Sequence, residues 1–84
     1  IVNHVYVPSE FEEKTEEFAN KIASGPSAVY GFMKKMANLS LTSNLAEILE
    51  QERIIQASLI TTSDHQEGVQ AFKEKRPPQF GKEY

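Results

Sequence analysis

Apolar residues recur every three or four positions along most of the chain, and this spacing predicts amphipathic α-helices. Turn residues and prolines divide the pattern into segments that should each form one helix. These segments span residues 9–24, 27–39, 44–60 and 64–76. Most of their starts carry the spacing of a capping box, with a side-chain acceptor three residues before a glutamate. The pairs are Ser9–Glu12, Asn44–Glu47 and Asp64–Glu67. The sequence therefore predicts a mainly α protein.

The ends of the helices are marked as clearly as their starts. The run Ser24-Gly25-Pro26 should stop the first helix, with Gly25 in the left-handed conformation of a C-cap. Arg76 precedes a proline, and a residue in that position disfavours helical geometry. The last helix should therefore end by Lys75 or Arg76.

The third helix should carry most of the core, and its apolar surface is wide. Its main stripe contains Leu45, Ile48, Leu49, Ile55 and Leu59. Ile54 and Ile60 lie outside this stripe, and a helix that is apolar over so wide an arc is usually contacted from more than one side. The second contact is either a separate partner or a central place in its own bundle, and both readings have equal weight. Glu52 falls on the stripe, so we expect a structural salt bridge for it. In the last helix, Val69 and Phe72 should pack inward.

The N-terminal segment has the composition of a strand rather than a helix. Residues 2–7 are rich in β-branched and aromatic side chains and are followed by Pro8. The sequence predicts no second strand, and a lone strand leaves its backbone N–H and C=O groups unpaired. We therefore expect its partner sheet to lie outside this chain. The first residue is Ile1 rather than methionine, which agrees with a fragment of a longer protein.

The composition mainly excludes several classes of protein and of binding site. A chain of 84 residues forms at most one small domain, and such a domain is marginally stable alone. It has no cysteine and only two histidines, so neither a disulfide framework nor a metal site is expected. The net charge of −3 argues against nucleic-acid binding, and no apolar run is long enough to cross a membrane. Additional burial should therefore come from contact with other polypeptide.

No constellation typical of catalysis can be recognised. The chain offers no Ser-His-Asp or Cys-His arrangement and no glycine-rich phosphate loop. Carboxylates crowd residues 10–17, where we expect a solvated helix face rather than acid–base groups. Cations crowd the other end at Lys73, Lys75 and Arg76, and this placement also suits a helix dipole. We predict no catalytic residue within the chain.

The most specific pattern lies in the tail. It reads Asp64-x-x-Glu67-Gly68-x-x-Ala71-Phe72-x-x-Lys75-Arg76-x-Pro78-x-Phe80. This run resembles the C-terminal signature of the enoyl-CoA hydratase/isomerase (crotonase) superfamily at every named position. Weaker similarity continues upstream through residues 2–5, 23–26 and 45–52. The resemblance thus covers the whole chain.

The resemblance implies the helical C-terminal region of a crotonase-like α/β spiral fold, preceded by one short orphan strand. Residues 1–8 would be the last strand or extended segment of a missing N-terminal catalytic domain, and residues 9–84 an oligomerisation and CoA-capping region. Family members process acyl-CoA in fatty acid metabolism as trimers or hexamers, in the cytoplasm or the mitochondrial matrix. Two backbone N–H groups stabilise an enolate, and carboxylates move protons. Those groups belong to the spiral domain, so none maps onto this chain. The coenzyme A thioester is a substrate, and no prosthetic group is implied.

Two residues match family positions that contact coenzyme A. Phe72 matches the aromatic residue that borders the CoA or acyl pocket. Lys75 matches the lysine that approaches the adenosine phosphate, and an ammonium is a suitable point-charge partner for phosphate. Arg76 could take the place of Lys75. The alternatives are that Phe72 only fills a core and that Lys75 only complements a helix end.

Two functions stay open from the sequence. The first is the C-terminal region of a hydratase/isomerase-type enzyme, and the second is a stand-alone helical protein-interaction module that uses its third helix. A module should bury residues 2–7 within its own chain, whereas a fragment should leave them unpaired. The reaction type also stays open among hydratase (a lyase), isomerase, hydrolase, decarboxylase and dehalogenase, because the deciding residues lie elsewhere.

Overall fold

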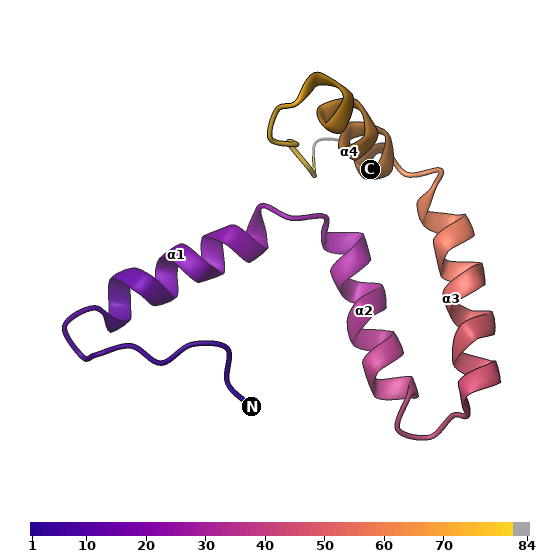
Figure 1. The fold of residues 1–84 in the computed structure, drawn as a ribbon, viewed down its shortest axis with the longest axis horizontal. Helices are drawn as coiled ribbons and strands as arrows, with labels where there is room; N and C mark the ends of the chain where they lie inside the picture. The colour runs from indigo at the N-terminus through magenta and orange to yellow at the C-terminus, as the bar shows by residue number, and fades with distance from the viewer. Residues whose placement is uncertain (82–84) are drawn as a thin grey trace.

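Helices joined by short turns dominate the architecture. The computed structural model describes residues 1–81. In chain order the helices are α1 (Phe11–Ala23), α2 (Ser27–Leu39), α3 (Leu45–Leu59) and α4 (Ser63–Glu74). Figure 1 shows their arrangement. Over the range described there is no strand, so the predicted mainly α fold is confirmed.

The principal packed unit is the pair of α2 and α3. These helices run antiparallel and lie side by side (Figure 1). Ile48 and Ile55 of α3 line one apolar groove together with Phe32 and Met36 of α2. The predicted stripe of α3 is thus only partly covered, because Leu45 and Leu49 at its start remain 73% and 54% exposed.

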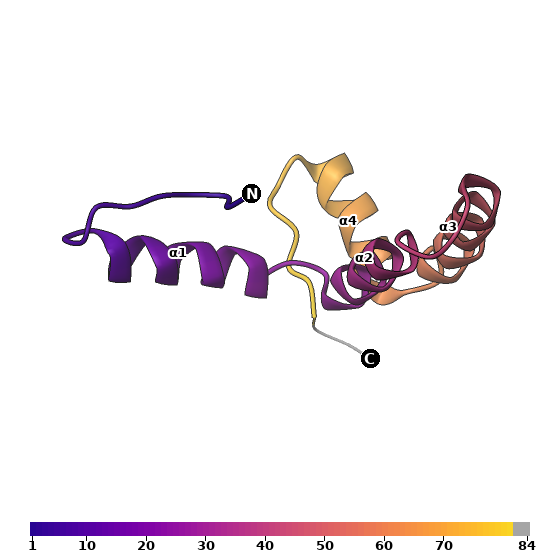
Figure 2. The same cartoon turned by 90° about the horizontal axis from the view of Figure 1, so that it is seen from below.

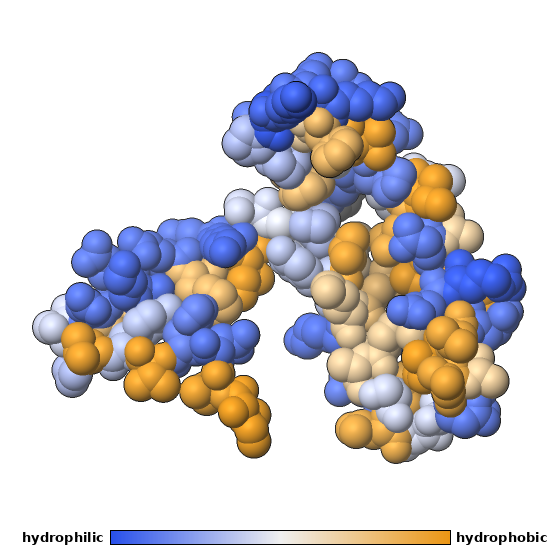
Figure 3. Space-filling view, viewed as in Figure 1, coloured by the Kyte–Doolittle hydropathy of each residue, from blue (hydrophilic) through white to orange (hydrophobic). Residues whose placement is uncertain are grey.

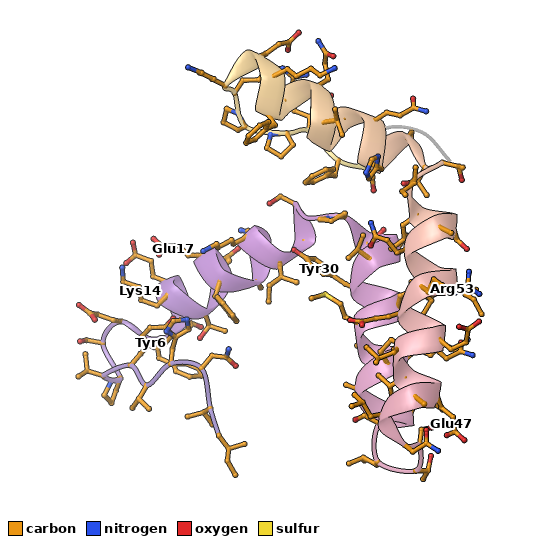
Figure 4. The ribbon with its side chains drawn as sticks, turned by 45° about the vertical axis from the view of Figure 1, so that its right-hand side comes forward. Tyr6, Lys14, Glu17, Tyr30, Glu47 and Arg53 are labelled. Atoms are coloured by element: carbon orange, nitrogen blue, oxygen red, sulfur yellow. The ribbon has the colours of Figure 1, made fainter. Side chains whose placement is uncertain are left out.

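Glu52 lines the same groove, yet the salt bridge expected for it is not found between residues 1 and 81. The neighbouring Arg53 pairs instead with Glu50 across one helical turn, at 2.6 Å between Nη2 and Oε1. Arg53 points away from α2 (Figure 4). The carboxylate of Glu52 stays exposed to solvent, which hydrates it without an ionic partner.

Residues 1–23 form an arm that extends away from the α2–α3 pair. Within it, residues 1–8 run back alongside α1 (Figures 1 and 2). Aromatic rings make the contact: the His4 ring lies 5.0 Å from that of Phe18, edge to face, and 5.6 Å from the stacked ring of Tyr6. The N-terminal segment finds no strand partner in the described part of the chain, and Val2 and Val5 are 76% and 87% exposed.

The chain is far more open than a compact domain of its length. Its Cα radius of gyration is 16.2 Å, whereas a compact domain of this length would have about 12 Å. Its accessible surface is 7179 Å², against roughly 5,000 Å² for a folded monomer of this mass. Of the described residues only Asp64 and Ala71 are buried. Figure 3 shows apolar side chains at the surface of the N-terminal segment and of the α2–α3 pair.

Not all predicted helix starts are correct. The capping box of α3 is present: the Asn44 side chain accepts from the Glu47 N–H at 2.9 Å, and Glu47 accepts from the Asn44 N–H at 3.2 Å. The box predicted at Ser9 is wrong, because α1 is entered through a backbone turn in which the Glu10 N–H donates to the Val7 carbonyl at 3.0 Å. Glu10 is the N-cap of α1, without a side-chain bond.

The prediction that Asp64 caps the last helix is also wrong. The Thr62 hydroxyl accepts from the His65 N–H at 3.2 Å, so α4 starts at Ser63 and Asp64 lies inside its first turn. The left-handed C-cap lies elsewhere than predicted as well. Among the described non-glycine residues it is Lys75, with φ 56° and ψ 44°.

Gly25 is needed for space rather than for a left-handed turn. A Cβ at this position would lie 1.9 Å from the hydroxyl oxygen of Tyr30. Tyr30 lies at the bend where the arm joins α2 (Figure 4). The stop between α1 and α2 was correctly predicted, although Gly25 does not adopt the left-handed conformation expected of it.

Candidate functional site

A groove of about 510 Å³ lies where the ends of α2, α3 and α4 meet the tail of the chain. Its walls are mostly apolar, with Asp64 and His65 among the polar exceptions. Contributions come from the start of α2, the end of α3, one side of α4 and the tail. The lining residues are Pro26, Val29, Gln56, Leu59, Thr62, Asp64, His65, Gly68, Val69, Phe72 and Phe80.

The tail, residues 76–81, folds back along α4. The N–H of Gly81 donates to Oδ1 of Asp64 at 2.8 Å. Asp64 is 8% exposed, and burial of a carboxylate requires hydrogen-bond partners such as this N–H. A bond between residues 17 positions apart closes α4 and the tail into one loop.

Glu67 binds the tail at two further points. Its carboxylate accepts two hydrogen bonds from the Arg76 guanidinium, at 2.6 Å and 3.1 Å. It also accepts from the backbone N–H of Gln79 at 2.8 Å. A bidentate bond between a guanidinium and a carboxylate fixes orientation as well as distance. We call the bonds of Asp64 and Glu67 to residues 76–81 the clasp.

The clasp covers one stripe of α4. Asp64, Glu67, Gly68 and Ala71 follow each other at helical spacing, so they share a face. The Phe80 ring lies over this face, where a Cβ on Gly68 would be 3.7 Å from the ring. Ala71 is 2% exposed. Gly68 and Ala71 are small, and this lets the tail lie close to the axis of α4.

Lys75 ends α4 in a conformation that glycine usually fills. The N–H of Lys75 donates to the Phe72 carbonyl at 3.3 Å, and the N–H of Arg76 donates to the Ala71 carbonyl at 3.1 Å. This is the bond pattern of a Schellman motif. A left-handed residue other than glycine costs roughly 1 kcal/mol. A cost of this kind at an exposed residue points to a role for the side chain itself.

The charges at this end of α4 are not equally available. Hydrogen bonds to Glu67 and then to Glu74 raise the pKa of Arg76 above its ordinary value. In turn, hydrogen bonds from Gln70 and then from Arg76 lower the pKa of Glu74. Arg76 is therefore occupied by carboxylates. Lys75 makes no ion pair within residues 1–81.

The two sequence-predicted site residues lie one turn apart at the end of α4. Phe72 lines the groove, and Lys75 is the C-cap of α4 and not one of the lining residues. The expectation that Val69 and Phe72 pack inward is wrong, because they are 41% and 86% exposed. Both line the groove and stay open to solvent in the described chain.

Sequence reasoning did not find the anchoring roles of Asp64 and Glu67. It assigned them to a capping box because their spacing fits one. The signal that could have shown the clasp is the arginine nine residues after Glu67, followed by prolines that turn the chain back. Over residues 1–81 no cluster of acidic and histidine side chains could hold a metal ion, and no helix there is long and apolar enough to span a membrane.

Comparison with known proteins decides the family. The model of the enoyl-CoA hydratase/isomerase family matches residues 1–83. This chain belongs to that family. The probable enoyl-CoA hydratase of Rhodobacter capsulatus is 41% identical over 71 residues, which are 84% of this chain and 28% of the relative. The trans-2-decenoyl-[acyl-carrier-protein] isomerase of Streptococcus mutans is 34% identical over 80 residues, which are 95% of this chain and 30% of the relative.

The structural comparison gives the same crotonase fold. The crystal structure of the enoyl-CoA hydratase of Geobacillus kaustophilus superposes with a TM-score of 0.79 at 31% identity, over 93% of this chain and 30% of that chain. The resemblance that was recognised in the tail is thereby confirmed. This member of the enoyl-CoA hydratase/isomerase family spans less than a third of the length of these relatives.

Proposed function

We propose that this chain is the C-terminal assembly and CoA-capping region of an acyl-CoA-processing enzyme, whose catalytic groups lie upstream of these residues. The observation that carries the proposal is that Phe72 lines an apolar groove and that Lys75 lies three residues later, at the end of the same helix. One is an aromatic ring that is 86% exposed, and the other is a lysine in a costly left-handed conformation. Family membership supports this class of substrate, because the family is that of the enoyl-CoA hydratases and isomerases and the named relatives include a probable enoyl-CoA hydratase.

The chemistry of the two side chains suits different parts of coenzyme A. The Phe72 ring offers an apolar wall to the pantetheine or acyl part of the thioester. The Lys75 ammonium offers a flexible point charge to the adenosine phosphate. Arg76 is less suitable for that role, because Glu67 and Glu74 already hold its guanidinium.

Assembly is the second part of the proposal. The chain exposes roughly 2,000 Å² more than a compact monomer of its mass would, which is the scale of obligate interfaces. The surplus includes Val2 and Val5 of the arm and Leu45 and Leu49 of α3. We infer that the catalytic domain and neighbouring subunits of a trimer or hexamer cover these side chains.

The stand-alone interaction module is less well supported. A self-contained module should bury its N-terminal segment, yet Val2, Val5 and Val7 are all more than half exposed. The exposed side of α3 fits a partner of either kind. Within residues 1–81 no backbone hydrogen bond is found for residues 2–6, which favours the neighbouring sheet of a catalytic domain.

The direct test is Lys75→Ala in the complete enzyme, meaning the polypeptide that joins the catalytic region to this chain. An enoyl-CoA ester should lose affinity about fivefold to tenfold, because a charge-assisted bond to phosphate is removed. The same ester of 3′-dephospho-CoA should be nearly unaffected. Lys73→Ala is the matched control, since Lys73 is another exposed lysine in the last turn of α4. Equal losses for both esters, or no loss for either, contradict the phosphate role of Lys75.

A further inference from the structure

We propose that Asp64 and Glu67 are positioning residues, which act through the clasp to hold Phe72 and Lys75 in the orientation that meets a CoA thioester. The inference rests on the proposed function of Lys75. It adds a role for two carboxylates that lie at the side of α4 and would not themselves touch the adenosine phosphate.

The bonds of the clasp surround the left-handed residue. Lys75 stands between α4, where its own N–H bonds to the Phe72 carbonyl, and Arg76, which Glu67 holds through two hydrogen bonds. Beyond Arg76 the tail is fixed again at Gln79 and at Gly81. Helix ends fray when their last residues have no such partners. The clasp therefore keeps the conformation of Lys75 populated although its side chain has no anchor of its own in residues 1–81.

The clasp also builds part of the groove. Asp64 lines the groove and at the same time accepts the Gly81 N–H. Phe80, between the two bonded tail residues Gln79 and Gly81, lines the same groove as Phe72. Release of the tail would remove one wall of the groove and leave the Phe72 ring without an opposite side.

Charge gives a third argument. Glu67 and Glu74 engage the Arg76 guanidinium at 2.6 Å and 2.5 Å. This pairing prevents a second cation from competing with Lys75 for one phosphate. It also neutralises Glu67, whose carboxylate would otherwise repel a phosphate near the end of α4.

The experiment uses Glu67→Gln in the complete enzyme, which removes the ion pair but keeps the size of the side chain. Glu50→Gln is the matched control, because Glu50 forms an exposed ion pair with Arg53 on α3, away from the tail. Hydrogen exchange of the Lys75, Arg76, Gln79 and Gly81 amides, which all donate hydrogen bonds in the structure, reports the clasp. Steady-state kinetics with an enoyl-CoA ester and its 3′-dephospho form report Lys75.

We expect Glu67→Gln to speed exchange in residues 75–81 and to raise KM for the CoA ester by about two- to fivefold at unchanged kcat, the scale of a partly exposed ion pair. KM for the dephospho ester should change less. In a Lys75→Ala background, Glu67→Gln should no longer change the ratio of the two KM values, because the residue through which it acts is gone and Glu74 still holds Arg76. Glu50→Gln should change neither exchange in the tail nor the ratio.

The inference is overturned if the tail loses protection in Glu67→Gln while the ratio of KM values stays that of the unmodified enzyme. The clasp would then be structural only. It is also overturned if the effect of Glu67→Gln persists without the Lys75 side chain. Failure of the proposed function looks different, since Lys75→Ala alone would then leave the ratio unchanged. If Glu67→Gln gives no soluble protein, Asp64→Ala opens the other end of the clasp and is judged by the same ratio.

Discussion

The two ends of the chain differ in how far their side chains are buried by the chain itself. At the C-terminal end, α4 and the tail satisfy each other: both residues that are buried in the described chain lie there, and Asp64 and Glu67 hold the tail at separate points. At the N-terminal end, the arm has no buried residue, and a ring contact between His4 and Phe18 joins residues 1–8 to α1. Bonds within the chain fix the conformation of α4 and the tail. The arm instead exposes apolar side chains that other polypeptide would have to cover.

This difference explains why the tail carries the most specific sequence pattern. Each residue of the clasp forms a hydrogen bond with another residue of the same chain, so that bond explains which residue type is found there. We infer that the apolar residues of the arm pack against a surface outside the chain, where many apolar side chains would fit equally well. The comparison can be tested by substituting residues in each region separately and measuring which other parts of the chain lose protection or stability.

The largest effect is expected from Ala71→Leu. Ala71 is 2% exposed under the tail-bearing face of α4, and overpacking of a buried site costs about 1–3 kcal/mol. The added atoms should push the tail away and expose the amides of Arg76, Gln79 and Gly81 to hydrogen exchange in the complete enzyme. Ala57→Leu, at an exposed position of α3, is the control and should leave these amides protected. Unchanged protection in Ala71→Leu would show that the tail does not depend on close packing against α4.

A smaller effect is expected at Gly25, where the arm joins α2. Alanine there would place Cβ 1.9 Å from the Tyr30 hydroxyl, so the ring must swing away. We expect a loss of about 1 kcal/mol in the free energy of unfolding, since the obstacle is a movable side chain. In a Tyr30→Ala background the loss should disappear, because the clash is removed. Gly31→Ala is the control, because a Cβ at Gly31 meets nothing within 4 Å in this chain.

The sequence allowed the helices, their approximate limits and the family to be predicted, because periodicity and the tail signature are local properties. It could not show which acceptor caps which helix. Thr62 and Asp64 are both good N-cap residues, and the choice depends on Gly81, 17 positions after Asp64, whose N–H occupies the carboxylate. The left-handed residue was assigned to Gly25 for the same reason, since propensity favours glycine and nothing local points to Lys75.

The candidate site was predicted only in part. Phe72 and Lys75 were named through the resemblance; Phe72 lines the groove, whereas Lys75 ends α4 outside the groove lining. The exposure of Phe72 was not foreseen, because an apolar residue at helical spacing is ordinarily expected in a core. Phe72 fits that stripe, yet it is 86% exposed in this chain. Whether such a residue is buried or exposed depends on what surrounds the helix, and the spacing of apolar residues along the sequence does not show this.

The smallest effect is expected from acid, and it should differ between regions. Hydrogen bonds from Gln70 and Arg76 lower the pKa of Glu74 in the folded chain. A carboxyl group whose folded pKa is lowered stabilises the fold above its unfolded pKa, and this contribution is lost as the pH falls through the folded pKa. The protection of the Lys75, Arg76, Gln79 and Gly81 amides, taken relative to the intrinsic exchange rate at each pH, should therefore fall slightly below about pH 4.

Glu74→Gln should remove part of this acid dependence, since glutamine keeps the size of the side chain and does not titrate. Exposed ion pairs are screened by salt, so added salt should also reduce the difference. The arm offers the matched comparison, with an exposed Lys14–Glu17 contact at 3.6 Å and, within residues 1–81, no hydrogen bond or ion pair to a distant segment. Lys14 and Glu17 lie on the side of α1 away from residues 1–8 (Figure 4). If exchange in the arm and in the tail responded equally to acid, the tail would not depend on its carboxylates, and the contrast between the two regions would rest on packing alone.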